Sequence, residues 1–217
     1  MREMFRRVVA TVATGLGYAT TLVSVPLVLL AIAIRRLSGF SPTTDPFVRF
    51  AAAVIPASFG IQVRLRGLHR VPLDRPVIVM ANHVNLFDGF VLRGHMPLNF
   101  RALELDEHFH WPIYGIAMRL YGNVEIPHRS PRKALHALDR AHRILESGTP
   151  LLVLPEGHRT RNGTIQPFMR GPFRLARRSG VSLLPVVLSG AYERKRVGSL
   201  RVTPGLIEIR VGEPLPA

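Results

Sequence analysis

One short run of the chain encodes a strand, a turn and the beginning of a helix. It reads Pro76-Val77-Ile78-Val79-Met80-Ala81-Asn82-His83-Val84-Asn85-Leu86-Phe87-Asp88-Gly89-Phe90. The apolar residues before Asn82 predict a short buried strand, and those from Phe87 onward can open a helix. Within one helix, His83 and Asp88 would lie about 140° apart. The two side chains can therefore meet only if His83 lies in the turn and Asp88 lies near the helix start.

A contact between His83 and Asp88 would have a chemical consequence. The carboxylate would accept one ring N–H, fix the tautomer and leave the other ring nitrogen free as a general base. A histidine that only stabilises the turn is the alternative interpretation, because His and Asp occur at this spacing in many unrelated sequences.

Asn82-His83-x4-Asp88 after an apolar strand resembles the first signature of the glycerolipid acyltransferase family, which includes the 1-acyl-glycerol-3-phosphate acyltransferases. A second resemblance follows another apolar run, in Leu154-Pro155-Glu156-Gly157-His158-Arg159-Thr160. The family's signature there is Pro-Glu-Gly-Thr-Arg-Ser. Glu156, Gly157 and Arg159 match it, whereas His158 and Thr160 depart from it.

Three further stretches complete the resemblance, in the family's order. Gly122-Asn123-Val124-Glu125-Ile126-Pro127-His128-Arg129 is similar to a signature made of Gly, a short apolar strand and Arg, although Glu125 interrupts the apolar stretch. Phe168-Met169-Arg170-Gly171 resembles a Phe-Lys-x-Gly continuation. Leu184-Pro185-Val186-Val187-Leu188 is similar to an apolar strand built around Val-Pro, which is expected to shape the wall that binds the acyl chain.

The resemblance implies an acyl transfer from a thioester to an alcohol. His83 is expected to take the proton of the acceptor hydroxyl, and Asp88 to orient the imidazole. The acceptor's phosphate is expected among Arg129, Arg159 and Arg170. Glu156, in the loop with Gly157, is expected to orient these arginines or to bind the glycerol hydroxyl.

The implied substrates are an acyl-CoA or acyl-carrier-protein donor and the lysolipid 1-acyl-glycerol-3-phosphate, and the implied product is phosphatidic acid for phospholipid biosynthesis. No cofactor and no metal is expected. Another lysolipid acceptor, such as lyso-ornithine lipid or a lysophospholipid, remains open, as does a catalytically silent membrane protein that binds lipid.

The charge of the chain is strongly basic, with a formal net charge of +15. Such a surplus suits nucleic acid, an anionic membrane surface or anionic small substrates. The arginines are dispersed, aromatic residues make up only 7% and no nucleic-acid-binding signature appears, so we expect no nucleic-acid partner. The absence of cysteine excludes disulfides and a thiolate nucleophile.

Two apolar segments precede the signatures. Val8 to Ile34 carries no charge and is long enough to span a bilayer, and Phe47 to Phe59 is shorter and contains Arg49. We expect a helical hairpin sunk into one leaflet, with one spanning helix followed by a core helix as the alternative. Glycines and Pro26 predict that the first helix is bent or broken. The expected location is the cytoplasmic face of the cell inner membrane.

The remaining pattern alternates strands with helices, which predicts an α/β fold with a layered mixed sheet flanked by helices. We expect residues 1–60 to form the membrane-associated helical segment and residues 61–217 the acyltransferase domain. Helices are predicted at 87–95, 111–121, 130–147 and 173–178. Strands are predicted at 61–66, 76–81, 98–105, 123–126, 151–154, 183–188 and 207–211.

Histidines and arginines outside the signatures are assigned no role. His108 and His110 resemble a metal-binding pair only superficially and are expected at the surface. His158 is expected to line the site or lie at the surface. The arginines at 174, 177 and 178 are expected on a solvated helix face.

Overall fold

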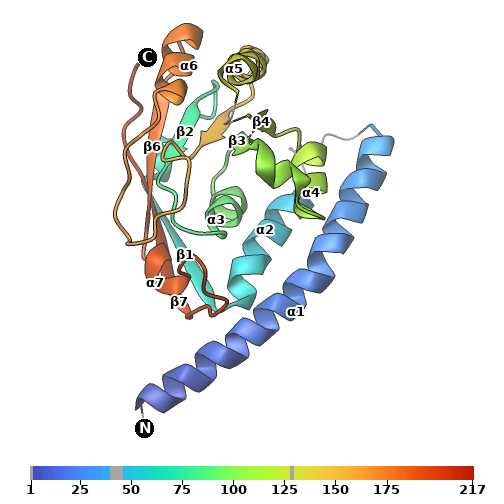
Figure 1. Ribbon diagram of the computed structural model, residues 1–217, viewed down its shortest axis with the longest axis vertical. Helices are drawn as coiled ribbons and strands as arrows, with labels where there is room; N and C mark the ends of the chain where they lie inside the picture. Colours follow the sequence, from blue (N-terminus) through green and yellow to red (C-terminus); the bar gives the residue numbers. More distant parts are fainter. Residues whose placement is uncertain (1, 40–45, 128–129) are drawn as a thin grey trace.

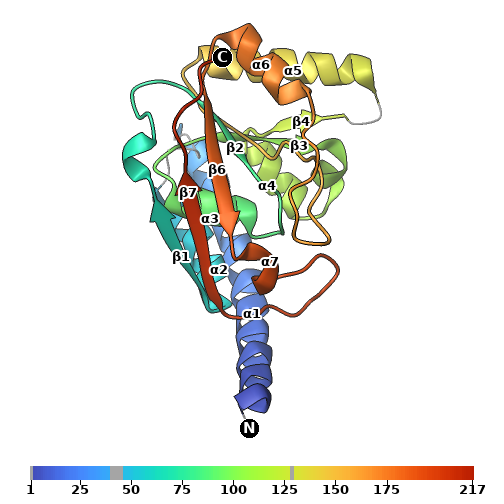
Figure 2. The same ribbon diagram turned by 90° about the vertical axis from the view of Figure 1, so that its left-hand side faces the viewer.

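A seven-stranded sheet forms the centre of the computed structural model, which describes residues 2–39, 46–127 and 130–217. The strand order is β1-β7-β6-β2-β5-β3-β4. Neighbouring strands are parallel except β6 and β7, so β1 and β7 run opposite to the other five (Figure 2). The strands are β1 (Ile61–Arg66), β2 (Ile78–Ala81), β3 (Arg101–Leu105), β4 (Val124–Ile126), β5 (Leu151–Val153), β6 (Leu183–Ser189) and β7 (Gly205–Val211).

Helices cover both faces of the sheet (Figure 1). They are α1 (Arg2–Leu37), α2 (Pro46–Ser58), α3 (Asp88–His95), α4 (Tyr114–Tyr121), α5 (Pro131–Glu146), α6 (Gly171–Ser179) and α7 (Ala191–Arg194), with 3₁₀ turns η2 (Leu68–Arg70) and η3 (Asp106–His110). The expected layered mixed sheet is confirmed.

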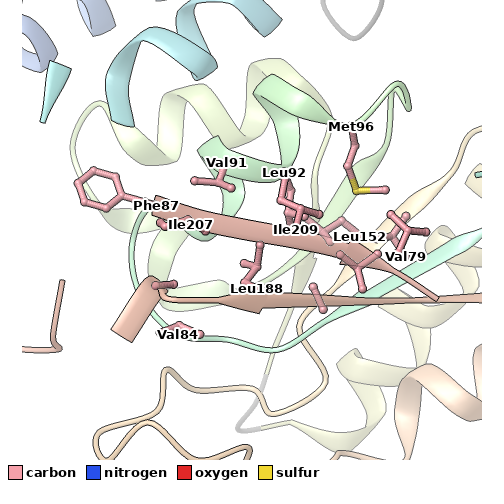
Figure 3. Close-up of a cluster of buried hydrophobic side chains, with 14 of the residues drawn as sticks. Val79, Val84, Phe87, Val91, Leu92, Met96, Leu152, Leu188, Ile207 and Ile209 are labelled. Atoms are coloured by element: carbon pink, nitrogen blue, oxygen red, sulfur yellow. The ribbon is translucent and has the colours of Figure 1, made fainter. Parts of the chain in front are cut away.

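The hydrophobic core has one part on each face of the sheet. Along β2, Val79 joins the cluster that packs under α2 and α3, whereas Ile78 and Met80 join the cluster under α5 and α6. This alternation follows from the two-residue period of a strand. Figure 3 shows the first cluster, in which Leu92 of α3 lies against β-strand residues such as Ile209. The core therefore fixes α3 against the carboxyl half of β2.

The N-terminal helix is continuous, so the expectation of a broken helix was wrong, whereas a bend stays a prediction. α1 runs from Arg2 to Leu37 with Pro26 inside it. Gly17 allows close packing, because a Cβ there would lie 2.2 Å from the Phe59 ring. Thr14 and Val202 exchange hydrogen bonds of 3.1 and 3.0 Å, so α1 is attached to the sheet domain at Thr14.

The surface of α1 is largely apolar. Among the described residues, Glu3–Ile34 is the one helix long and apolar enough to cross a membrane, judged by length and composition alone. Only 11% of its most apolar stretch is buried, so α1 is not an ordinary core helix. α2 packs beside it (Figure 1). This exposed apolar surface indicates association with a membrane.

The segment before α4 differs from the expected helix. The apolar pattern predicts a helix from Trp111, but η3 ends at His110 and α4 begins only at Tyr114. Ile113 lies between them with φ of 64°, a conformation that β-branched residues rarely adopt. Pro112 and Ile113 thus form a tight turn that changes the direction of the chain before α4.

Candidate active site

The carboxyl ends of β2, β5 and β6 meet at one edge of the sheet, which is where open α/β sheets bind ligands. Asn82 joins two of them. Its side-chain amide donates to the Leu188 carbonyl at 3.1 Å, and its side-chain oxygen accepts the Leu188 N–H at 2.7 Å. The residue that begins the first signature therefore fixes the end of β2 against β6.

His83 and Asp88 are in contact across the turn that follows β2. The distance between His83 Nδ1 and Asp88 Oδ2 is 2.9 Å. Asp88 is the first residue of α3, as the contact requires. When the Nδ1–H group of His83 donates its hydrogen bond to the carboxylate, the Nε2 atom carries no hydrogen and can accept a proton.

The Asp88 carboxylate is buried and organises the whole turn. Its Oδ2 also accepts the backbone N–H groups of Val84 at 2.6 Å and Asn85 at 2.9 Å. Asn85 extends the arrangement, since its side chain donates to the Ala191 carbonyl at 2.8 Å and accepts the Phe87 N–H at 2.8 Å. The turn is thus held from α3 and from the segment after β6, which restricts the position of His83.

Glu156 makes contacts that differ from the expected ones. Its side chain is buried, with Oε1 accepting the His83 N–H and Oε2 accepting the Gln166 N–H, both at 2.7 Å. In this position the carboxylate joins the His83 turn to the loop after β5. Its described partners are backbone N–H groups and not the arginines, and a contact with the glycerol hydroxyl stays a prediction.

The loop after β5 folds over the same turn. The Thr160 N–H donates to the His83 carbonyl at 2.9 Å. Gly157 has a φ of 74°, and a Cβ there would lie 2.9 Å from Met169 Cε. The left-handed conformation therefore favours glycine at this position, whereas the flexible Met169 side chain could move away from a Cβ.

An apolar cavity of about 370 Å³ opens beside His83. Its walls come from α1, α2, α3, β3 and α4. The residues from the hairpin include Val25, Leu29, Ile32, Ala52 and Ile55. Polar side chains are few, and His83 and Arg159 are among them. A cavity of this size and composition is typical of a site for a small, mostly apolar ligand.

Arg93 lines the far part of the cavity. It is 8% exposed, donates to the Phe100 carbonyl and lies over the Phe100 ring, 4.1 Å from its centroid. Burial lowers the pKa of Arg93 to about 10. Phe100 directly precedes β3, and the starts of β3 and β2 lie side by side because Arg101 and Ile78 both pair with Leu151 of β5. His83 is five residues beyond Ile78, so roughly 16 Å of extended chain separates the His83 end of the cavity from the Phe100 end.

A profile of the acyltransferase family matches residues 62–189, which is more than half of the chain. The chain belongs to the acyltransferase family. It is 30% identical over 197 residues to a 1-acyl-sn-glycerol-3-phosphate acyltransferase alpha from Ovis aries, covering 88% of this chain and 67% of that protein. A Homo sapiens protein of the same description is 28% identical, with 88% of this chain and 68% of that protein covered.

Two further comparisons extend this finding. A Chlamydomonas reinhardtii 1-acyl-sn-glycerol-3-phosphate acyltransferase is 30% identical, and the match spans 92% of this chain but 58% of that protein. The crystal structure of the 1-acyl-sn-glycerophosphate acyltransferase PlsC from Thermotoga maritima has a TM-score of 0.80 with 24% identity, covering 97% of this chain and 87% of that one. This similarity shows that the two proteins share the same fold.

The basic residues that the signatures single out have different positions in the acyltransferase. Arg159 lines the cavity with His83, and no ion pair involves it in the described part of the chain. Arg129 lies outside the described residues. Arg170 is exposed just before α6 and is not among the described residues of the cavity wall. A role for Arg129 or Arg170 in phosphate binding stays a prediction.

Lys195 is a cation near Arg159 that the sequence did not single out. It is 8% exposed and donates to the Ser199 carbonyl. Burial and then the positive charge of Arg159 lower the pKa of Lys195. Its being one of only two lysines in an arginine-rich chain was a weak indication from the sequence that it has a specific role.

The expectation for His108 was wrong. Its ring Nδ1 donates a hydrogen bond to Glu104 Oε2 at 3.0 Å, and both residues line the cavity. The Tyr114 hydroxyl donates to Glu104 Oε1 at 3.3 Å, and burial, followed by the Glu104 charge, raises the pKa of Tyr114. No sequence signal predicted this contact, because Glu104 lies in β3 and His108 in η3. His110 and His158 are exposed.

The strand around Val-Pro does not form the wall that was expected of it. Leu184, Val186 and Leu188 of β6 belong to the hydrophobic core, and no β6 residue is among the described residues that line the cavity. These side chains face the same side of the sheet as α2 and α3, but they pack into the hydrophobic core there with residues such as Leu92. Within residues 2–39, 46–127 and 130–217, no group of three or more His, Asp and Glu could hold a metal ion.

Proposed function

We propose that this protein transfers a fatty acyl group from an acyl thioester to the free hydroxyl of 1-acyl-glycerol-3-phosphate, forming phosphatidic acid at a membrane. The observation that carries the proposal is the His83–Asp88 pair, 2.9 Å apart, beside an apolar cavity that also receives Arg159. The names of the relatives support the choice of acceptor.

The chemistry proceeds through the acceptor's own hydroxyl. His83 Nε2 takes the hydroxyl proton as the oxygen attacks the thioester carbon, and Asp88 stabilises the imidazolium. When the carbon–sulfur bond breaks, the thiolate leaves and recovers the proton from His83. A positioned base of this kind accelerates a reaction by roughly 10²–10⁴-fold. No acyl-enzyme intermediate and no metal is required.

The two substrates use different parts of the site. The acceptor's phosphate binds Arg159 near Lys195, since a guanidinium fork suits phosphate oxygens and a second cation adds to the attraction. The acyl chain extends through the apolar cavity toward Arg93. The donor is acyl-CoA or acyl-carrier-protein, both of which are anionic and compatible with the basic chain.

The hairpin of α1 and α2 lies in one leaflet, with the catalytic domain at the cytoplasmic face of the inner membrane. α1 is held along the sheet domain through Thr14 and Gly17, so a helix crossing the bilayer would carry the flank of the domain into the lipid. Lying in one leaflet, α1 instead exposes its apolar side chains to lipid while the domain stays in water.

Arg159→Ala is expected to raise the KM for 1-acyl-glycerol-3-phosphate much more than the KM for the acyl donor. A hydrogen bond to a charged group contributes roughly 1.5–3 kcal/mol, which corresponds to about tenfold or more in binding. Steady-state kinetics with a labelled acyl thioester and a panel of phosphate-bearing and phosphate-free lysolipids would measure both constants. Arg161→Ala is the matched control, because Arg161 is exposed on the same loop.

Two results of this panel would contradict the proposal. A rise in the donor KM alone would place the donor at Arg159. Equal use of a phosphate-free acceptor, such as lyso-ornithine lipid, would show that the enzyme acylates another lysolipid.

Cysteine labelling is expected to place the N-terminal end of the hairpin and the catalytic domain on the same, cytoplasmic side. The chain has no cysteine, so Glu3→Cys and Ser147→Cys each create a single target, and both positions are exposed. An impermeant maleimide should label both variants in inverted membrane vesicles and neither in intact cells. Labelling of the Glu3 position from outside, with Ser147 accessible only from inside, would instead establish one spanning helix.

A further inference from the structure

Three large apolar side chains are exposed on one short stretch outside the hairpin. Trp111 is 41% exposed, Ile113 46% and Ile116 52%. They lie in residues 111–116, between η3 and the first turn of α4, which we name the rim segment. Single exposed apolar residues are ordinary on a protein surface, but a contiguous group indicates an interaction site.

The rim segment borders the mouth of the cavity. Trp111 and Ile113 line the cavity and are also exposed, so they must lie where it opens to the outside. Leu86, in the turn that holds His83, is likewise exposed and part of the lining. The opening therefore lies between the catalytic turn and the rim segment.

The rim segment lies close to the apolar surface of α1. α4 packs against α1 and is seen beside its C-terminal half in Figure 1. On that half of α1, Leu27, Leu30 and Ile34 are each more than half exposed. A membrane that contacts the apolar side chains of α1 would thus also contact the rim segment. Because the two apolar surfaces are continuous, we expect lipid to cover the rim segment.

The apolar side chains of the rim segment are presented by a braced backbone. Ile113 keeps its unusual φ of 64°, while the Gly115 N–H donates to the Trp111 carbonyl at 2.9 Å. The Trp111 ring lies 4.8 Å from the His108 ring and 5.9 Å from the Tyr114 ring. Unusual backbone conformations persist where the surroundings hold them, and they concentrate at functional sites.

We propose that the rim segment is a second lipid-contacting surface, seated at the membrane interface so that the cavity opens sideways into the leaflet. Tryptophan favours this interface because its ring is apolar and its N–H is polar. A lysolipid or acyl chain would enter between the rim segment and α1 without crossing water. The inference rests on the membrane association in the proposed function but not on the identity of the acceptor.

Trp111 is the single tryptophan of the chain, which makes its fluorescence a direct probe. The full-length protein would be reconstituted in phosphatidylcholine vesicles containing anionic lipid. We expect the emission to shift to shorter wavelength, to be quenched by phospholipids brominated on the acyl chain, and to be protected from aqueous iodide. The control is Trp111→Phe with Leu135→Trp, because Leu135 is exposed on α5, across the sheet from the hairpin. Its emission should respond to iodide and not to the brominated lipid.

Vesicle flotation separates this inference from membrane binding as a whole. If the protein floats with the vesicles but Trp111 is quenched by iodide and not by brominated lipid, the rim segment stays in water and the inference is wrong. Shielding of Trp111 from both quenchers would contradict it equally, because that outcome indicates a protein partner.

Ile116 supplies a second variant, since it is exposed and does not line the cavity. Ile116→Glu should weaken the quenching of Trp111 by brominated lipid and reduce turnover of acceptor held in vesicles. Leu135→Glu, the matched control, should leave both unchanged. If the two variants had equal effects, the loss of quenching and turnover would be due to the added negative charge and not to a lipid contact of the rim segment.

Discussion

His83→Ala is expected to lower kcat by roughly 10²–10⁴-fold, the usual contribution of a positioned general base. The fold should survive, because the contacts that hold the turn use the backbone of His83 and not its ring. Its N–H donates to Glu156 at 2.7 Å, and its carbonyl accepts the Thr160 N–H at 2.9 Å. Turnover and thermal melting of the purified variant would be measured together.

Near-normal turnover by the His83→Ala variant would show that His83 is not the general base. A large fall in melting temperature would instead show that the imidazole is part of the structure of the turn. His83→Gln provides a control that keeps a polar side chain but supplies no comparable base.

Asp88→Asn is expected to reduce turnover similarly and, unlike His83→Ala, to destabilise the fold. One carboxylate oxygen accepts the His83 ring N–H and two backbone N–H groups, and the side chain is 1% exposed. Hydrogen bonds to a charged group contribute roughly 1.5–3 kcal/mol each, and an amide oxygen accepts them less strongly. Urea unfolding would measure the free energy, with kcat measured beside it.

The double variant His83→Ala, Asp88→Asn tests whether the two residues act as a unit. If Asp88 acts through the imidazole, the double variant should lose little more turnover than His83→Ala alone, because the effects of coupled catalytic residues are not additive. Additive losses would mean that Asp88 contributes to catalysis by another route.

The catalytic turn could be predicted from the sequence because its geometry is local. The apolar run ends at Ala81, a few residues before the helix begins, and only a turn between them allows His83 to reach Asp88. β2 and α3 confirm this arrangement. The partners of Glu156 could not be predicted in this way, because they are backbone N–H groups, one of them 73 residues away.

The wall of the cavity was also beyond prediction from sequence patterns. His108 was expected at the surface, but η3 follows β3 directly and folds its ring back to within 3.0 Å of Glu104 Oε2. The strand around Pro185 was expected to line the acyl chain, but its place in the sheet puts it in the core. In both cases the position depends on tertiary packing, which local periodicity does not determine.

The most direct test of the account is the stoichiometry of transfer by the purified enzyme. A labelled acyl thioester and 1-acyl-glycerol-3-phosphate would be supplied in mixed micelles, and the free thiol and phosphatidic acid would be quantified in the same sample. The account predicts one phosphatidic acid for each thiol released by the wild-type protein, and a roughly 10²–10⁴-fold lower rate of both products with His83→Ala. Thiol release without phosphatidic acid, or phosphatidic acid formation by the His83→Ala variant at the wild-type rate, would contradict it.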